Sequence, residues 1–280
     1  MSRIDIKKTY KLFIGGQFPR SESGRSYEIK GANGKFIANP ALASRKDLRD
    51  SVTSAKSALS GWSSATAFNR GQILYRIAEI MEGRRDQFVT EIIALEGGSA
   101  KAANTQVEQA IDLWVWYAGW CDKISTIAGA TNPIAGPYYN FTTPEELGVV
   151  GIIADQKDSL LGLVAAIAPV VATGNTAVVI ASEKRPLPAI TLSEALATSD
   201  LPAGVLNILT GKVSELAPWL ASHMEIDGLD ISGVDPKIES ELRIAGAENL
   251  KRIHRFNKSQ SPQRMLAFME AKTVWHPIGV

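Results

Sequence analysis

A single cysteine, Cys121, is the first side chain to consider for chemistry in this chain of 280 residues. A thiolate acts as a nucleophile when a base or a positive charge lies beside it and substrate can reach it. Cys121 instead belongs to an apolar series with intervals of three and four, the spacing of one helix face. A cysteine in such a series is typically a small buried hydrophobe. The series predicts a structural cysteine, and its other members are Val107, Ile111, Trp114 and Ala118.

The other side chains that could carry catalysis or bind a metal are scattered. His223, His254 and His276 have no serine or cysteine partner within a motif. One cysteine cannot form an internal disulfide, and no cysteine and histidine cluster has the spacing of metal ligands. The glycine pairs at 15–16 and 97–98 predict turns, because no G-x-G-x-x-G segment follows a strand. The sequence therefore predicts neither a metal site nor a catalytic residue.

The composition is that of an ordinary globular protein, with 45% hydrophobic residues and a net charge of +1. Such a balance offers no basic field for nucleic acid. The longest apolar run, residues 160–172, is shorter than the roughly 20 residues of a membrane span. The first eight residues are charged and lack the apolar core of a signal peptide. We expect a soluble, cytoplasmic protein with no nucleic-acid or membrane partner.

The first half of the chain predicts short strands followed by helices. Residues 10–18 indicate two short strands around Gly15-Gly16, and Asn33-Gly34 is typical of the turn of an edge hairpin. Ser44 is a natural helix N-cap, with Asp47 in capping-box register. Apolar periodicity then predicts helices that include residues 48–62, 73–81, 88–95 and 107–124.

The second half alternates apolar strands with helices. Strands buried on both faces that alternate with helices indicate a parallel, doubly wound α/β sheet with helices on both faces. Any ligand of such a sheet binds beyond the carboxyl ends of the strands. After the fourth strand the pattern weakens, and no comparable catalytic domain follows. The predicted strands are 148–153, 176–180, 205–210 and 228–232, and the predicted helices are 160–173, 186–197 and 213–223.

Six segments in the right order resemble the aldehyde dehydrogenase superfamily over nearly the whole chain. The resemblance implies a Rossmann-like domain of the kind that forms the N-terminal part of those enzymes. None of the matching segments contains a catalytic residue. They include Trp116–Lys123, Gly148–Ile153, Ala168–Thr176, Leu201–Asn207 and Asn249–Arg252, together with Lys11–Ile14.

At the family's functional positions this chain carries other residues. Lys157, in Asp155-Gln156-Lys157, replaces the asparagine that helps to hold the oxyanion, and Ile180 replaces the lysine that contacts the cofactor ribose. Phe256 stands at the position of the glutamate base, and the domain with the nucleophilic cysteine is missing. Gly233-Val234-Asp235 replaces the phosphate-binding Gly-Ser-Thr, so that Asp235 places a negative charge there, although it is also a normal helix cap.

The resemblance leaves a weak set of cofactor-binding positions, for NAD or NADP if a cofactor binds at all. Glu183 is retained from the family pattern, but a solvated or helix-capping glutamate is its simpler interpretation. The sequence gives no catalytic residue to go with this set. Its members are Lys157, Ser182, Glu183, Gly211 and Gly233.

A closer resemblance is to the cysteine-less second domain of family-16 aldehyde dehydrogenases, here expected as a stand-alone chain. The C-terminal Lys-Thr-x-x-Trp-x-Pro-x-Gly segment, residues 272–279, carries this likeness. By analogy, Tyr138–Thr143 and Lys272–Val280 resemble the family's oligomerisation arm, and a strand such as the former is suited to pair with another chain. The domain division implied is a nucleotide-binding-type domain over 1–131 and 148–257, with arm strands over 132–147 and 270–280.

Three interpretations follow. The first is a catalytically inactive subunit that assembles with itself or with a full-length aldehyde dehydrogenase. The second is an NAD(P)-dependent oxidoreductase acting on aldehydes through an unusual site, with Lys157 and Glu183 as candidates. The third is a scaffold that binds another nucleotide or a small acid at the strand ends, where Lys157 would contact the anion.

Overall fold

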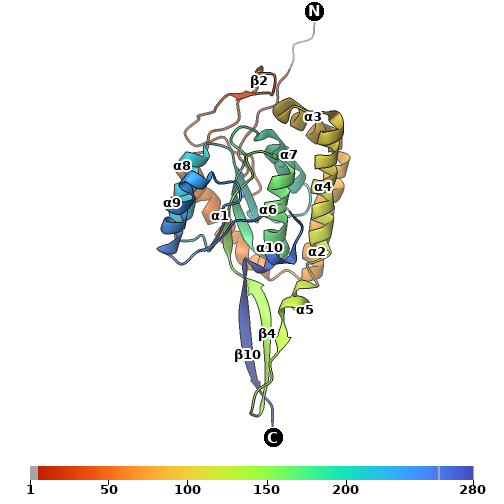
Figure 1. The fold of residues 1–280 in the computed structure, drawn as a ribbon, viewed down its shortest axis with the longest axis vertical. Helices are drawn as coiled ribbons and strands as arrows, with labels where there is room; N and C mark the ends of the chain where they lie inside the picture. The colour runs from red at the N-terminus through yellow and green to blue at the C-terminus, as the bar shows by residue number, and fades with distance from the viewer. Residues whose placement is uncertain (1–5, 258, 280) are drawn as a thin grey trace, which may run out of the picture.

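A computed structural model describes residues 6–257 and 259–279. Lys258 and Val280, the last residue of the predicted arm tail, therefore lie outside the described residues, as do residues 1–5. The chain forms a body of helices around a sheet, and a narrow arm projects from one end of that body (Figure 1). No helix in the described ranges is both long and apolar enough to cross a membrane.

A five-stranded parallel sheet lies at the centre of the body, in the order β7-β6-β5-β8-β9. Its first four strands in the chain confirm the predicted ones: β5 (Val149–Ile153), β6 (Thr176–Ile180), β7 (Leu206–Leu209) and β8 (Gly228–Asp230). The sequence did not predict β9 (Arg252–His254), which is three residues long and only half buried. Such a short strand has too few residues to show a pattern. The doubly wound fold is nonetheless as predicted.

Side chains alternate between the two faces of this sheet and feed two separate hydrophobic clusters. In β6, Ala177 and Val179 join one cluster, whereas Val178 and Ile180 join the other. This period of two is the consequence of strand geometry. Helices on both faces cover the apolar surface, which explains why these strands are apolar throughout.

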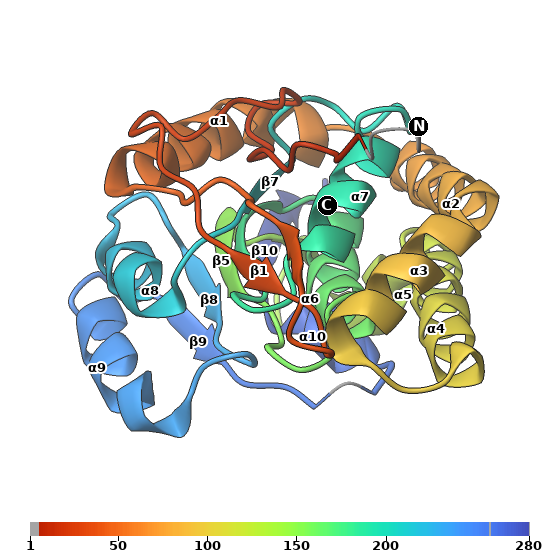
Figure 2. The same cartoon turned by 90° about the horizontal axis from the view of Figure 1, so that it is seen from above.

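The helices form an inner and an outer layer on one face and a single layer on the other (Figure 2). The first face carries α6 (Leu161–Ala172), α7 (Leu187–Leu196) and α10 (Pro262–Leu266), with α2 (Ala67–Gly83), α3 (Arg85–Glu96) and α4 (Ala100–Ala118) outside them. The second face carries α1 (Arg45–Ser63), α8 (Val213–Ser222) and α9 (Pro236–Ala247).

The N-terminal hairpin and the cap of the first helix are as predicted. β1 (Ile29–Lys30) pairs antiparallel with β2 (Phe36–Ala38), and Gly34 in the turn has a φ of +74°. A positive φ of this size suits glycine best. Ser44 and Asp47 form the predicted capping box. Within residues 10–18, the two predicted strands shrink to single bridges at Phe13 and Ile14.

The predicted helix over 107–124 is wrong at its C-terminal end. The helix α4 stops at Ala118, and Cys121 lies in the turns between α4 and α5 (Ile124–Ala128). The apolar spacing continued past the end of the helix because Cys121, which lies in the following turn, also points into the core. Only 1% of its surface is exposed. The prediction of a buried cysteine is therefore confirmed, although the helix that was expected to hold it has already ended.

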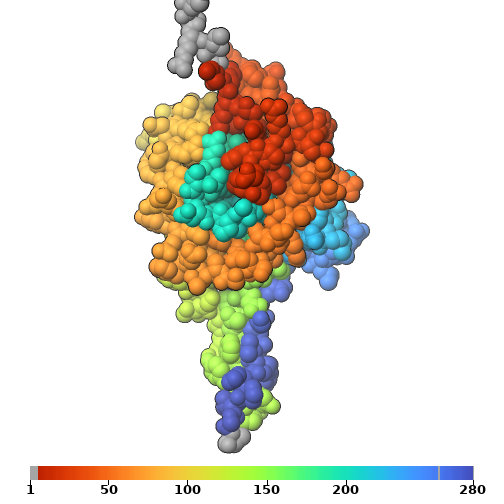
Figure 3. All heavy atoms as spheres, turned by 180° about the vertical axis from the view of Figure 1, so that it is seen from behind, coloured from red at the N-terminus to blue at the C-terminus, as the bar shows by residue number. Residues whose placement is uncertain are grey.

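The arm is a three-stranded antiparallel sheet in the order β10-β4-β3. Its long strands are β4 (Tyr138–Glu146) and β10 (Met269–Pro277), which pair along their whole length, and β3 (Ala130–Thr131) adds a short third strand. The predicted strand 138–143 thus lies in the middle of the sheet, paired within the chain. One open edge belongs to β10, and the short β3 covers only part of the other side of β4. The arm stands clear of the body (Figure 3).

Candidate functional site

The carboxyl ends of the parallel strands are the expected ligand edge, above all at the switch point between β5 and β8. All five predicted cofactor-binding residues lie at this edge. Lys157 follows β5, Ser182 and Glu183 follow β6, Gly211 follows β7 and Gly233 follows β8. The fold thus gathers residues that are up to 76 positions apart in the chain.

A glutamine side chain ties the ends of β5 and β6 together. The amide oxygen of Gln156 accepts a hydrogen bond from the Glu183 backbone N–H at 2.9 Å, and its amide nitrogen donates to the Ala154 carbonyl at 2.7 Å. The Ser182 hydroxyl donates to the Gln156 carbonyl at 3.3 Å. The amide of Gln156 and the hydroxyl of Ser182 are therefore already hydrogen-bonded within the chain.

The crevice at the switch point is closed by backbone packing. The Gly233 N–H donates to the Ile153 carbonyl at 3.0 Å. A Cβ on Gly233 would lie 1.8 Å from the Ala154 carbonyl oxygen, a distance that no side chain tolerates. Gly233 is therefore a glycine because β5 and the segment after β8 touch there.

The N-terminus of α8 is occupied by a carboxylate of the chain. The Val213 backbone N–H, the first of that helix, donates to Glu183 Oε2 at 3.1 Å. Glutamate at a helix N-terminus satisfies a free donor and complements the positive end of the helix dipole. The helix-capping interpretation of Glu183 is therefore confirmed.

The N-terminus of α9 is closed in the same manner. The Asp235 carboxylate accepts from the Lys237 N–H at 3.0 Å, and the Asp235 carbonyl accepts from the Ile238 N–H at 3.1 Å. Pro236, between them, has no N–H to offer. The Arg255 guanidinium binds the segment that precedes this helix by donating to the Ser232 and Val234 carbonyls.

The chain entering α6 is held by a third carboxylate, which the sequence did not predict. Glu96 Oε1 accepts from both the N–H and the hydroxyl of Ser159, at 2.9 and 2.6 Å. Gln106 donates to the other Glu96 oxygen at 3.0 Å and accepts from the Leu160 N–H at 3.3 Å. Glu96 precedes Ser159 by 63 residues, and no local pattern links the two.

Lys157 differs from the other predicted residues at this edge because its side chain has no partner among the described residues. Its backbone is fixed, since its N–H donates to Asp155 and its carbonyl accepts from Arg185. Its side chain is exposed and makes no hydrogen bond or ion pair with any residue that the structure describes.

Phe256, at the position predicted from the family for the base, belongs to an aromatic cluster. Its ring stacks on His254 and meets Phe268 edge-on, with centroids 5.5 and 6.1 Å apart. The Arg264 guanidinium covers the ring at 4.8 Å and pairs with the fully buried Asp230 at 3.2 Å. Burial raises the pKa of Asp230, and the Arg264 charge opposes that rise.

The segment 255–268 leads directly from the parallel sheet into the arm. It starts at the carboxyl end of β9, contributes α10 beside α6 and enters β10 at Met269. Because only 14 residues separate β9 from β10, no second domain is inserted between them.

Cys121 lies far from this edge, and its thiol is in an environment that makes it unreactive. It lies between α4 and α5, at the end of the body beside the arm (Figure 1). Burial raises the pKa of its thiol to about 12, which leaves almost no thiolate at neutral pH. Its Sγ donates to the Tyr117 carbonyl at 3.4 Å. Among the described residues, no group of three or more histidine, cysteine, aspartate or glutamate side chains could hold a metal.

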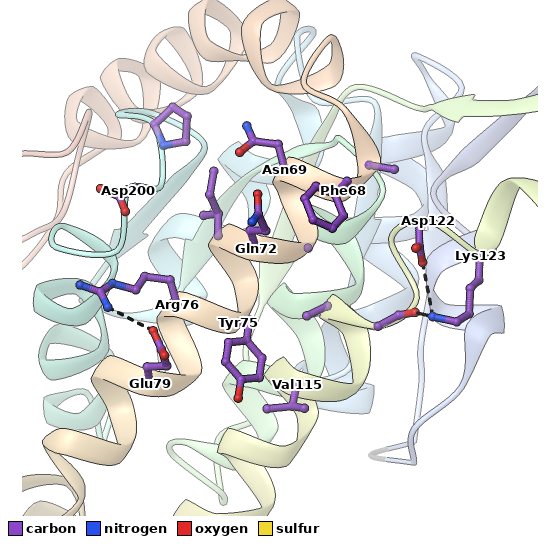
Figure 4. Close-up of a pocket in the computed structure, with 16 residues that line it drawn as sticks. Phe68, Asn69, Gln72, Tyr75, Arg76, Glu79, Val115, Asp122, Lys123 and Asp200 are labelled. Carbon is purple, nitrogen blue, oxygen red and sulfur yellow. Dashed lines mark hydrogen bonds and ion pairs between the residues drawn. The ribbon is translucent and has the colours of Figure 1, made fainter.

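A cavity of about 970 Å³ also lies elsewhere. It is an open hollow between α2 and α4, lined by Phe68, Tyr75 and Val115 (Figure 4). Four of its charged groups form two ion pairs, Arg76 with Glu79 at 3.1 Å and Lys123 with Asp122 at 3.3 Å. None of the predicted site residues lines it.

Comparison with known proteins gives one consistent result. Residues 18–263 match the family model described as the aldehyde dehydrogenase family. The chain is 32% identical to cytosolic 10-formyltetrahydrofolate dehydrogenase of Xenopus tropicalis, over 90% of this chain and 29% of that protein. It is 32% identical to human retinal dehydrogenase 2, over 94% of this chain and 51% of that protein.

Solved structures agree with the sequence relatives. The NAD+ complex of an aldehyde dehydrogenase from Bacillus cereus superposes with a TM-score of 0.83 at 25% identity, covering 88% of this chain and 50% of that one. HpcC of Thermus thermophilus gives a TM-score of 0.84 at 27% identity, covering 89% and 48%. The chain thus spans about half or less of the length of these relatives.

Proposed function

The chain belongs to the aldehyde dehydrogenase family, and from that membership we propose that it is a catalytically inactive subunit, assembling with itself or with a full-length aldehyde dehydrogenase. The family is NAD(P)-dependent, so the proposal has two parts. One is the loss of the nucleotide site, and the other is the retention of an assembly surface.

The observation that carries the first part is the occupation of the ligand edge by the chain's own carboxylates. Glu183 caps α8, Asp235 caps α9, and Glu96 holds the backbone that enters α6. A pyrophosphate bound at this edge would need helix N–H donors that these groups already use. It would also meet their negative charge, so the residues present do not fit a dinucleotide phosphate.

The reactive groups support the same proposal. The thiol of Cys121 is buried and far from the edge, and Phe256 cannot accept a proton. Aldehyde oxidation through a thiohemiacetal needs an accessible thiolate and a base within hydrogen-bond reach. We assign no catalytic step to this chain.

We also propose the division of the chain into a nucleotide-binding-type domain over 1–131 and 148–257 and arm strands over 132–147 and 270–280. What supports it is the short bridge between β9 and β10, which leaves no room for a catalytic domain. The arm would serve assembly, because β10 is an edge strand and Tyr138, Tyr139 and Trp275 are exposed along the arm. We also propose that the protein is cytoplasmic, because one of the relatives named above is a cytosolic enzyme.

Titration calorimetry with NAD and with NADP tests the first part. We expect no saturable heat at millimolar cofactor, while a full-length aldehyde dehydrogenase measured beside it binds. Saturable binding that weakens in Lys157→Gln would support the second interpretation, an oxidoreductase with an unusual site. The specific observation in favour of that alternative is the exposed Lys157 ammonium at the strand ends, which has no ion-pair partner within residues 6–257 and 259–279.

Affinity purification of the tagged chain from its native host tests the second part. We expect a second copy or an aldehyde dehydrogenase to co-purify, and Trp275→Lys on the arm to abolish that association. Phe68→Lys, at an aromatic on the body that is 68% exposed against 59% for Trp275, is the matched control and leaves association unchanged. Association that persists in Trp275→Lys but is lost in Phe68→Lys would contradict the proposal, because it would show that the interface lies on the body and not on the arm.

A further inference from the structure

A second hollow, of about 530 Å³, lies between the N-terminal end of α1 and the C-terminal half of α8. This volume falls in the roughly 300–1,000 Å³ typical of small-molecule sites. Its walls include Arg45, Lys46 and Arg49 of α1 and Trp219 and His223 of α8 and its C-cap. None of these residues takes part in the strand-end contacts described above.

The positive charge of this hollow is concentrated and poorly neutralised. Arg49 pairs with Asp50 at 3.5 Å, but neither Arg45 nor Lys46 forms an ion pair with any described residue. The lining carboxylate, Glu22, accepts a hydrogen bond from the Ser44 hydroxyl at 2.9 Å. The Lys251 ammonium donates to the carbonyl of His223, one of the lining residues, at 2.6 Å.

The placement of these cations works against the stability of α1. Arg45 and Lys46 are the first two residues of that helix, where the helix dipole is positive. Cations there are disfavoured by roughly 0.3–1 kcal/mol each. A bound anion would relieve this repulsion, and the Lys46 ammonium has no ion-pair partner among the described residues that would otherwise relieve it.

An aromatic platform completes the hollow. The Arg45 guanidinium lies 3.6 Å from the centroid of the Trp219 ring, and the ring remains 41% exposed. A stacked guanidinium and indole offer a flat surface on which a planar ring can lie, with the guanidinium edge free to donate hydrogen bonds. His223 Nδ1 accepts from the Glu225 N–H at 3.2 Å, which leaves its Nε2 as a further donor.

We propose that this hollow binds a small phosphate ester that carries a planar ring, of which a nucleoside monophosphate is the simplest example. The phosphate lies against Lys46, Arg49 and the Arg45 guanidinium, and the ring stacks on the Arg45–Trp219 pair. The site is separate from the strand ends, so it stands whether or not the family's dinucleotide site has been lost.

Calorimetry with AMP, adenosine and inorganic phosphate at low salt tests the proposal. We expect saturable AMP binding that weakens by about tenfold or more in Arg45→Gln and in Lys46→Gln, since each removes a charge-assisted hydrogen bond. Trp219→Leu should reduce the affinity for AMP to that for phosphate, while leaving phosphate binding unchanged. Adenosine, which lacks the phosphate, should bind at least about tenfold more weakly than AMP.

The matched control is Lys56→Gln, which makes the same charge change at an exposed position of the same helix. It should leave AMP binding unchanged. Absence of saturable binding at millimolar AMP would overturn the proposal, as would equal losses in Lys56→Gln and Lys46→Gln. AMP binding that is lost in Lys157→Gln and kept in Lys46→Gln would assign the nucleotide to the strand ends instead.

Discussion

The thiol of Cys121 should be nearly inert in the folded protein. Its pKa of about 12 lies three units above the ordinary value of 9.0, because burial disfavours the charged form. Three units correspond to about a thousandfold less thiolate at pH 8. Only 1% of its surface is exposed, so a reagent in solution cannot reach the sulfur. We therefore expect modification to be slower than that of a free thiol by about a thousandfold or more.

The assay is the rate of reaction with an aromatic disulfide reagent at pH 8, followed by absorbance in buffer and in concentrated urea. The matched control is a Cys121→Ser chain that carries Ser60→Cys, an exposed position on α1. We expect the control to react at the same rate in both solutions and the natural chain to react quickly only in urea. A native rate within about tenfold of the control would refute the burial argument, since it requires a population of thiolate that the structure does not allow.

Three further predictions concern stability, each measured by urea unfolding. Trp114→Ala should cost about 3–5 kcal/mol, because its ring is fully buried, while Phe68→Ala, at a side chain 68% exposed, should change the midpoint little; similar losses would contradict the packing described. Arg264→Met should cost about 3–5 kcal/mol by leaving Asp230 buried without its partner, and adding Asp230→Asn should recover part of that loss; simple additivity of the two would argue against a coupled pair. Burial raises the pKa of Glu91, so its contribution to stability is present below its unfolded pKa and is lost as pH rises through the folded pKa. Glu91→Gln should therefore gain stability relative to the natural chain as pH rises from 4 to 7, and a constant difference would contradict this.

The sequence predicted the fold well wherever one element carries its own signal. The apolar strands β5 and β6, the capping box at Ser44 and the turn at Asn33-Gly34 were all visible as local patterns. The end of α4 was mistaken because Cys121 continues the apolar spacing from a turn beyond the helix. A burial pattern reports which face is apolar, and it does not report whether the backbone is still helical.

The candidate site was predictable in part, since strand ends in a parallel sheet must converge. This placed Lys157, Glu183 and Gly233 at one edge, and the capping interpretation of Glu183 came from residue type alone. The contact between Glu96 and Ser159 joins the end of α3 to the turn that precedes α6, and the Asp230–Arg264 pair joins β8 to α10. Such partners are set by tertiary structure, so no spacing in the sequence could reveal them.

The most direct measurement is NAD reduction by the purified chain with a simple aldehyde such as propanal. With its helix ends capped by its own carboxylates and its only thiol buried, the chain should produce no NADH above the blank. Turnover that disappears in Cys121→Ser would contradict this account, because it would place the reacting group on a side chain that the fold keeps away from substrate.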